Sequence, residues 1–489
     1  MTTSLDRWTG IARSFPFTLE DSYDIADILD TPDGFVVILN REENPAGSGA
    51  NQPELTFMML LKIAFDGKVI WRISISARDP NQGPETISYR TKGSSVIRTR
   101  DGEGFLVTGT VSKRSSPQKK EARLFVCRID KCGLLQWIRT YTDDAGESAA
   151  AISIVALDTP LGDLSRYMIA AQGSSPDSPF FGYLGPAWVF VIDDDGNVIG
   201  DGVHHYGLER IDLASLRLLP TFGPVLVGRT YKREWIGALH EVPAWMLRVS
   251  NDGLPISEGM FLPRAMCGYP NPQLYFMDVA EGMTQVVAVG QQYGAAPGGG
   301  GAYVFLDGVP GPEGRTGTPT LGRALDDPGI RDYLRSISAL TLEDDTGHKF
   351  RHFAITAYGW LARMNEAGAF VWEKTYKAIG PSTWYVFLHE VAWRSNGDIV
   401  AGGFFLPGTF IPGRYGAAPL VYSDSQPDDR TIPTCSALSL TQQTDMEVDR
   451  TPGPMVNDSF TVFVQNWTAV VDADGYVVLY CHQGEQAGG

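Results

Sequence analysis

The chain has 489 residues, of which 43% are hydrophobic and 20% are charged, and its formal net charge is -17. This composition is ordinary for a soluble globular protein that can bury a large core. The acidic balance disfavours nucleic acid and anionic membrane surfaces as partners, because contacts to phosphate groups need clustered Lys and Arg.

The first fifteen residues lack the basic start and the apolar core of a signal peptide, and no apolar run approaches the ~20 residues that a membrane-spanning helix needs. The five cysteines are Cys127, Cys132, Cys267, Cys435 and Cys481. Because their number is odd and small for this length, we expect free thiols and not a disulfide framework. A cytoplasmic protein, or a component of a particle assembled in the cytoplasm, fits these features, and no membrane insertion is expected.

A stretch from Phe57 to Trp71 reads as a strand, a tight turn and a second strand, and it recurs in weaker form along the whole chain. The glycines of the successive turns are Gly67, Gly133, Gly196, Gly253, Gly308, Gly368 and Gly475, with a degraded copy near residue 424. Neighbouring copies lie roughly 50 to 66 residues apart. A period of this length is typical of a repeat architecture.

A second β-rich run precedes each of these turns and confirms the period independently. The eight runs begin at Gly34, Gly104, Arg166, Pro224, Gln285, His352, Asp398 and Ser459. Several follow an Asp-Gly or Asn-Gly turn, which is the usual signal of a β-hairpin. A weaker candidate strand precedes some of the runs, for example at residues 23–29 and 386–393. Each unit therefore reads as four antiparallel strands.

Strands of this length cannot bury two faces alone, so neighbouring units must stack on one another. We predict an all-β protein in which residues 1–489 form a single β-propeller of eight four-stranded blades, with seven blades as the alternative. The segment near residues 8–14 resembles an outer strand. We expect it to close the ring beside the C-terminal unit, residues 435–482, because closure removes exposed sheet edges.

Three units carry a tryptophan four residues after the turn glycine, at Trp71, Trp137 and Trp372. A side chain that recurs at one place in a repeat favours a structural role over ligand stacking. We expect these indoles to pack as wedges between adjacent blades.

The repeated pattern resembles that of bacterial β-propeller repeat proteins, which have Asp-Gly-x-Phe-Val-x-Gly runs followed by Leu-x-x-Asp-x-x-Gly-x-x-x-Trp-x-x-Thr-Tyr. The segments that carry the resemblance best are 101–109, 128–137 and 363–372. Over residues 20–482 this resemblance implies the propeller fold, and it implies no particular activity, since propellers serve many functions.

Enzyme-bearing propellers match less well. Residues 67–71 are similar to part of the docking motif of quinoproteins, but the sequence lacks the adjacent cysteine pair that many of those enzymes have. The Asp boxes of sialidases have a different spacing, and the paired Gly-His and Trp-Asp of WD40 units are missing. Carboxylates gathered in the channel from different blades stay open as a catalytic alternative.

Two kinds of residue suggest a metal site. The acidic segments 193–197 and 472–475 lie at predicted turns, where backbone geometry alone favours Asp and Gly. His204 and His205 are adjacent on a strand, so their side chains point to opposite faces and do not reach one ion. We therefore expect no metal and no cofactor, and we name no catalytic residue.

The loops between the second and third strands of the units differ most, and several are rich in aromatic residues, Gly and Pro. All of them lie on one face of a propeller, and loops on a rigid scaffold are where binding usually resides. The candidate ligand-binding residues in these loops are Tyr183, Trp188, Tyr293, Arg414 and Tyr415.

These features favour a non-enzymatic interaction module whose loop-rich face binds a protein partner, within a larger assembly. A lectin-like propeller that binds carbohydrate is the first alternative, and a glycosidase or quinoprotein is the second. Aromatic sites repeated once per blade would favour the lectin, whereas channel-facing carboxylates or arginines with shifted pKa values would favour an enzyme. A broad apolar patch on one face would favour an assembly component.

Overall fold

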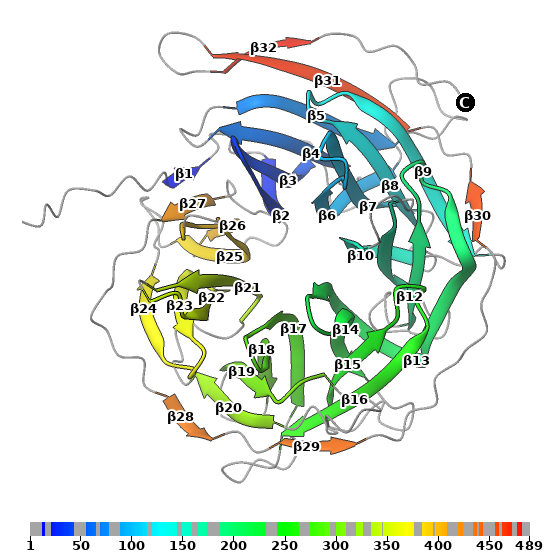
Figure 1. The fold of residues 1–489 in the computed structure, drawn as a ribbon. Helices are drawn as coiled ribbons and strands as arrows, with labels where there is room; N and C mark the ends of the chain where they lie inside the picture. The colour runs from blue at the N-terminus through cyan, green and yellow to red at the C-terminus, as the bar shows by residue number, and fades with distance from the viewer. Residues whose placement is uncertain are drawn as a thin grey trace, which may run out of the picture.

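The computed structural model of the chain is an all-β ring in which small antiparallel sheets surround a central axis (Figure 1). The structure describes residues 12–14, 21–43, 55–64, 69–77, 89–114, 120–143, 149–158, 165–173, 185–230, 242–263, 273–293, 300–309, 319–325, 334–344, 346–375, 384–394, 397–407, 419–423, 434–437, 440–443, 455–458, 462–471 and 477–481. The ring of small antiparallel sheets confirms the predicted β-propeller. No helix in these ranges is long and apolar enough to cross a membrane.

The described strands form seven units, each with its first strand nearest the axis. Unit 1 consists of β2 (Asp21–Thr31), β3 (Gly34–Glu43), β4 (Leu55–Ala64) and β5 (Val69–Ala77). Unit 2 consists of β6 (Tyr89–Arg98), β7 (Gly104–Arg114), β8 (Lys120–Asp130) and β9 (Leu135–Asp143). Unit 3 consists of β10 (Ala149–Ala156), β11 (Tyr167–Gly173), β12 (Gly185–Ile192) and the first part of β13 (Val198–Leu219). The long strand β13 continues into unit 4, so one eight-stranded sheet contains two blades.

The other four units follow in chain order. Unit 4 consists of the second part of β13 with β14 (Gly223–Thr230), β15 (Ala244–Val249) and β16 (Pro255–Pro263), and unit 5 of β17 (Gln273–Glu281), β18 (Val286–Tyr293), β19 (Gly300–Leu306) and β20 (Pro319–Leu325). Unit 6 consists of β21 (Ser336–Glu343), β22 (Lys349–Ala357), β23 (Trp360–Asn365) and β24 (Phe370–Thr375). Unit 7 consists of β25 (Trp384–Trp393), β26 (Ile399–Pro407), β27 (Pro419–Ser423) and β1 (Ala12–Ser14).

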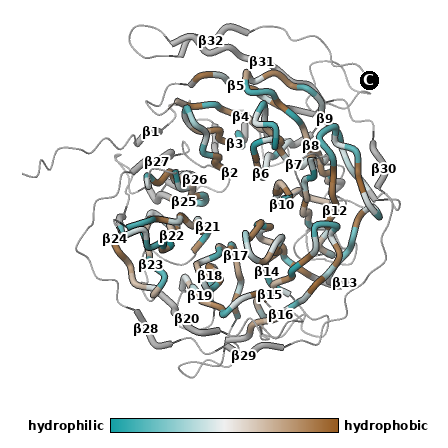
Figure 2. The backbone as a smooth tube through the Cα atoms, viewed as in Figure 1, coloured by the Kyte–Doolittle hydropathy of each residue, from teal (hydrophilic) through white to brown (hydrophobic). Residues whose placement is uncertain are grey.

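Seven hydrophobic clusters hold the ring together, and each draws its residues mainly from two neighbouring units. The last one joins unit 7 to unit 1, with Val400 packed among residues such as Ile25 and Val37. Apolar stretches accordingly recur in the strands all around the ring (Figure 2). Every unit thus buries both faces of its sheet against its neighbours, which a four-stranded sheet alone cannot do.

The N-terminal strand closes the ring, but with another partner than the one predicted. Strand β1 pairs antiparallel with β27, where Ala12 lies opposite Val421 and Ser14 opposite Pro419. It therefore supplies the outer strand of unit 7 and does not pair with residues 435–482.

The predicted eighth unit does not form a blade among the described residues, so the alternative count of seven describes the ring. Its strands lie outside the ring instead (Figure 1): β28 (Thr434–Ala437) pairs with β20, β29 (Leu440–Gln443) with β16, β30 (Met455–Asp458) with β9, and β31 (Val462–Val471) with β5, while β32 (Val477–Cys481) pairs with β31. The physical reason is that the contact of unit 7 with unit 1 already closes the ring. Pairing with outer edges still covers backbone groups that would otherwise be open.

Each tryptophan of the repeat packs as predicted between units. The Trp71 indole Nε1 donates a hydrogen bond to the carbonyl of Lys131 at 3.1 Å, and Trp137 Nε1 donates to the carbonyl of Asp194 at 3.0 Å. A Cβ built on Gly133 would lie 2.9 Å from the Trp71 ring, and one on Gly196 would lie 2.8 Å from Trp137. The turn glycine is therefore needed both for its positive φ and for the approach of the preceding unit's indole.

Glycines in the second strands serve a different purpose, because they let the first strand of the same unit come close. A Cβ on Gly290 would lie 1.8 Å from the carbonyl oxygen of Tyr275, and one on Gly403 would lie 1.8 Å from that of Phe387. A Cβ on Gly228 would likewise lie 2.3 Å from the carbonyl oxygen of Asp212. In each case the first strand has a β-bulge, with one extra residue, just beyond the residue that pairs with the glycine.

Replacing Gly290 with alanine should destabilise the protein by about 3 kcal/mol, since the new methyl group overlaps a backbone oxygen that cannot move without breaking the sheet. Chemical denaturation of the variant measures this change. The matched control is Ala171→Gly at the corresponding position of unit 3, which should cost about 1 kcal/mol or less. Equal effects of the two substitutions would contradict the close approach.

Candidate functional site in the central channel

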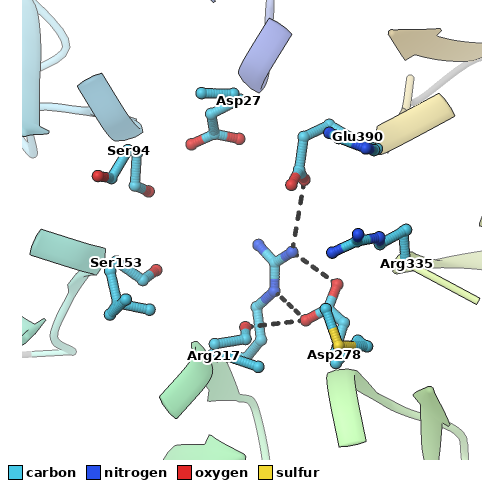
Figure 3. Close-up of a pocket in the computed structure, with 14 residues that line it drawn as sticks. Asp27, Ser94, Ser153, Arg217, Asp278, Arg335 and Glu390 are labelled. Atoms are coloured by element: carbon cyan, nitrogen blue, oxygen red, sulfur yellow. Dashed lines mark hydrogen bonds and ion pairs between the residues drawn. The ribbon is translucent and has the colours of Figure 1, made fainter. Parts of the chain in front are cut away.

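A polar pocket lies where the first strands of the seven units face the axis (Figure 3). Its volume is about 180 Å³, far more than the ~10–15 Å³ that admits one water molecule. Its lining is Ala26, Asp27, Ser94, Ser95, Ile152, Ser153, Ala214, Ser215, Arg217, Met277, Asp278, Arg335, His389 and Glu390. Every unit contributes to this lining, so the pocket exists only in the closed ring.

A β-bulge in six of the seven first strands positions these residues. The register shifts fall between Ile25 and Asp27, Gly93 and Ser95, Ala151 and Ser153, Leu213 and Ser215, Phe276 and Asp278, and Leu388 and Glu390. A bulge adds one residue and bends the strand, so two successive side chains are redirected. The two residues at each bulge therefore line the channel together.

The second residue of each bulge is polar. Together with Ser336 at the start of β21, these residues form the polar ring, which consists of Asp27, Ser95, Ser153, Ser215, Asp278, Ser336 and Glu390. The residue that follows each of them is an apolar side chain buried between the units, such as Ile28 or Val279. The bulge thus separates the channel surface from the core.

The fixed centre of the polar ring is an ion pair between Asp278 and Arg217. Arg217 Nε donates to Asp278 Oδ1 and Nη2 donates to Oδ2, both at 2.7 Å. Both oxygens of Asp278 also accept backbone N–H groups, from Val279 at 2.9 Å and Ile337 at 3.0 Å. Burial lowers the pKa of Arg217, but the charge and hydrogen bonds of Asp278 outweigh it, so that pKa lies above its ordinary value.

Glu390 and Asp27 are less well paired. Glu390 Oε2 lies 4.0 Å from Arg217 Nη2 and accepts a hydrogen bond of 3.3 Å from Ser336. Burial, with the nearby charge of Asp27, raises the pKa of Glu390 well above its usual range. Burial also raises the pKa of Asp27, although its carboxylate accepts the N–H groups of Val96 at 2.7 Å and Ile28 at 2.8 Å.

Serine hydroxyls form the wall of units 2 to 4. Ser94 Oγ donates to the carbonyl of Ala151 at 2.8 Å, Ser153 Oγ donates to that of Leu216 at 3.1 Å, and Ser215 Oγ donates to Asp278 Oδ1 at 2.9 Å. Their protons are used within the wall, so their oxygen lone pairs are what this side offers to a ligand. The pocket is therefore rich in hydrogen-bond acceptors.

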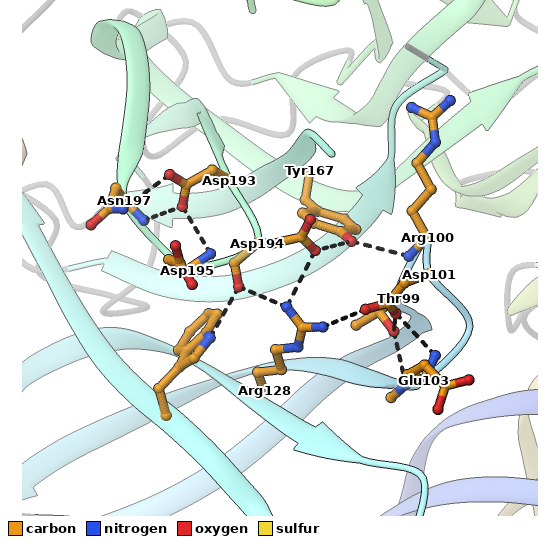
Figure 4. A network of polar contacts seen from close by, with 12 residues as sticks. Thr99, Arg100, Asp101, Glu103, Arg128, Tyr167, Asp193, Asp194, Asp195 and Asn197 are labelled. Carbon is orange, nitrogen blue, oxygen red and sulfur yellow. Dashed lines mark hydrogen bonds and ion pairs between the residues drawn. The ribbon is translucent and has the colours of Figure 1, made fainter. Parts of the chain in front are cut away.

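The tight turns between the first and second strands and between the third and fourth strands share one face, here called the turn face. Polar contacts connect its neighbouring units (Figure 4). Arg128 pairs with Asp101 of its own unit at 2.6 Å and with Asp194 of the next at 3.4 Å, and Tyr167 donates to Asp194 at 2.7 Å. Similar contacts join units 3 and 4 and units 7 and 1.

The acidic segment 193–197 has the predicted turn geometry. Asp193 Oδ1 accepts the N–H groups of Asp195 at 3.0 Å and Asn197 at 2.8 Å, so its carboxylate caps its own turn. The other acidic segment, 472–475, lies outside the described residues. His204 packs beside Tyr206 while His205 stacks on Trp188, so the two imidazoles point to opposite faces as expected.

Of the residues predicted from the variable loops, the two that the structure describes, Trp188 and Tyr293, do not line this pocket. Trp188 is not a loop residue: it lies in β12 with a fully buried side chain, stacked on His205 at 5.1 Å between ring centres, and it belongs to the core between units 2 and 3. Tyr293 is the last residue of β18, opposite Gln273. Tyr183, Arg414 and Tyr415 lie outside the described residues.

Sequence reasoning allowed for carboxylates in the channel but named none of them. The missed signal is a short pattern in the first strand, namely Asp, Ser or Glu followed by a branched or long apolar residue. It occurs as Asp27-Ile28, Ser95-Val96, Ser153-Ile154, Ser215-Leu216, Asp278-Val279, Ser336-Ile337 and Glu390-Val391. Aligning the first strands with the same period as the turns would have found it.

No protein-family model and no curated protein sequence matches this chain. Among solved structures, the Dos1 propeller is similar with 8% identity and a TM-score of 0.42, over 84% of this chain and 95% of that one. The haemagglutinin-neuraminidase ectodomain of parainfluenza virus 5 is similar with 9% identity and a TM-score of 0.35, over 84% of each chain. The propeller assignment rests on the strand pairing described above, and these likenesses add no functional argument.

Replacing Glu390 with glutamine should change how stability depends on pH. In the unfolded chain this carboxyl has a pKa near 4.5, whereas burial raises the pKa in the folded protein. The folded state therefore binds more protons above pH 4.5, and the wild-type free energy of unfolding falls as pH rises through the raised pKa. Glutamine does not titrate, so the Tm of the variant should gain on that of the wild type between pH 5 and pH 8.

Thermal unfolding at several pH values measures this difference. The control, Glu103→Gln, removes one carboxylate from the exposed turn face. The quantity to follow is the Tm of Glu390→Gln minus the Tm of the wild type. If this difference stays constant or becomes smaller as pH rises, burial does not destabilise the ionised form of Glu390.

Proposed function

We propose that the protein is a ligand-binding propeller and that its channel pocket holds a small polar molecule. The polar ring carries this proposal, because six bulges direct one polar side chain each toward the same cavity. A structural plug for the channel would need only apolar residues. Bulges that aim polar side chains at a cavity are a recurrent feature of functional sites.

The pocket supports binding better than catalysis. An acid–base pair needs two groups whose surroundings move their pKa values apart. Here burial raises the pKa of both Asp27 and Glu390, so the two carboxyls resemble each other in this respect. The lectin alternative with aromatic sites repeated in each blade loses support, because Trp71 and Trp372 are packing residues between units.

Filling the pocket tests this function. Ala214 is a half-buried bulge residue of the lining, and Ala214→Trp should block the cavity while leaving the polar ring in place. Calorimetric titrations with sorbitol, glucamine (1-amino-1-deoxysorbitol), gluconate, glycine and phosphate should show binding of at least one probe to the wild type. That affinity should fall at least tenfold in Ala214→Trp and stay within about twofold in Ala214→Ser. Binding that survives the tryptophan, or no binding of any probe, would reject the proposal.

A protein partner is the second candidate, and one observation favours it on the turn face. The large hydrophobic side chains that are exposed in the described part of the chain all lie in or just after tight turns: Ile70, Leu134, Leu254, Ile256, Met283 and Val371. Apolar groups that recur on one face are typical of an interaction surface. The partner surface proposed here is thus the turn face, whereas the sequence pointed to the opposite, loop-bearing face.

Introducing charge on this face tests the partner. The double variant Leu134→Glu and Leu254→Glu should keep the wild-type Tm within a few degrees, since both side chains are about half exposed. Both forms are cross-linked in the native host and purified, and the proteins that come with them are quantified. The double variant should recover at least tenfold less of any protein that the wild type recovers in stoichiometric amount. Recovery of the same protein in equal amount would exclude the turn face as the contact.

A further inference from the structure

We infer that the ligand of the channel pocket is a small polyhydroxylated amine, whose ammonium group lies between Asp27 and Glu390 and whose hydroxyl groups face the serines of units 2 to 4. This inference rests on the proposed function and adds the chemical class of the ligand. It follows from which charges in the pocket already have partners and from what the remaining groups can accept.

Arg217 and Asp278 neutralise each other and leave little for a ligand. Their two hydrogen bonds of 2.7 Å form a bidentate pair, which is the strong geometry for a guanidinium and a carboxylate. The Asp278 carboxylate also accepts a hydrogen bond from Ser215 at 2.9 Å, and it shares the hydroxyl proton of Ser336, at 3.2 Å, with Glu390, at 3.3 Å. This pair is thus a fixed part of the wall.

Asp27 and Glu390 remain as carboxylates without a cation of their own. Among the described residues, the one basic group paired with Glu390 is Arg217, at 4.0 Å, and Asp27 forms no ion pair. The negative charge of Asp27 contributes to the raised pKa of Glu390. Two partly buried carboxylates near one shared guanidinium are stabilised by a further positive charge between them.

The other basic residues of the lining face different groups. His389 Nδ1 lies 3.3 Å from Asp24 Oδ1. The positive charge of Arg335 acts on Tyr275, as do the charges of Asp212 and Arg229. Among the contacts of the described residues, neither His389 nor Arg335 forms an ion pair with Asp27 or Glu390.

The serine wall calls for hydrogen-bond donors as well. Ser94, Ser153 and Ser215 donate their hydroxyl protons to protein oxygens, so they can only accept from a ligand. A molecule with an ammonium group at one end and hydroxyl groups along its chain offers donors to both walls. A carboxylate or phosphate ligand would meet acceptors on both sides and leave them unpaired, at a free-energy cost.

Three six-carbon probes of nearly equal shape test the inference with the 489-residue chain. Glucamine carries an ammonium group where sorbitol carries a hydroxyl group, and gluconate carries a carboxylate. Titration calorimetry at pH 7 should show that glucamine binds at least tenfold more tightly than sorbitol and that gluconate binds most weakly. Between pH 5 and pH 7 the affinity for glucamine should rise, because its ammonium group displaces a proton held by the two carboxyls. Titrations in buffers of different ionisation enthalpy should show that proton release.

Two variants connect the preference to the proposed residues. Glu390→Gln and, separately, Asp27→Asn should each weaken glucamine binding about tenfold and leave sorbitol binding within about twofold. Their unfolding transitions establish that they are folded, and the wild-type comparison of the three probes decides the question independently of them. Equal or tighter binding of sorbitol or gluconate would overturn the amine class and leave the channel pocket as a binding site. Failure of all three probes to bind would overturn the amine class as well, and with the wider probe set it would overturn the proposed function.

Discussion

The channel surface of this protein depends on one extra residue in the first strand of six units. Without the bulge, a residue such as Asp278 would follow the regular alternation of the strand, and every second side chain would point into the core between units. With it, two successive residues reach the channel while the next one, Val279, is buried. The facing glycine of the second strand permits this bend where a side chain would overlap the first strand's carbonyl, as at Gly290.

The same repeat explains why the ring closes at seven units. Each unit presents one apolar face to the preceding unit and one to the next, so the ring is complete when unit 7 meets unit 1 through Val400 and its neighbours. The seventh unit obtains its outer strand from the N-terminus, through β1 and β27. The remaining β-rich sequence at the C-terminus then has no face to join, and its strands pair with the outer edges of units 5, 4, 2 and 1.

Much of this fold could be predicted from the sequence because its signals are local. A turn glycine and a tryptophan four residues later, as at Gly133 and Trp137, mark the third and fourth strands of a unit, and the structure shows why both are needed. The number of blades could not be obtained by counting such units. Strand pairing with distant edges is not encoded in a hairpin pattern, and the hairpin around Gly475 has the same local sequence features as those within the ring.

The candidate site was harder to predict for a related reason. In a sequence, a loop is recognised as an irregular segment rich in aromatic residues, and Trp188 was predicted to bind a ligand for this reason. The residue lies instead in a strand, with its side chain buried in the core. The channel residues lie in the strands with the weakest sequence signal, where a single Asp or Ser interrupts an apolar run. Each one alone is an ordinary strand residue, and only their common place in the repeats brings six of the seven polar-ring residues to one cavity.

The polar ring also shows how a repeated scaffold can acquire an asymmetric site. Seven equivalent positions hold three acids and four serines, and Arg217 comes from a neighbouring position in unit 4. Because Asp278 is bound closely to Arg217, the carboxyl groups of the pocket that lack a close cation are Asp27 and Glu390, in the adjacent units 1 and 7. Substitutions at the position after the bulge can therefore change the charge and the hydrogen bonding of the pocket one unit at a time. The buried apolar residue that follows each position keeps the contact between units unchanged, so the recognition surface and the stability of the ring are governed by different side chains.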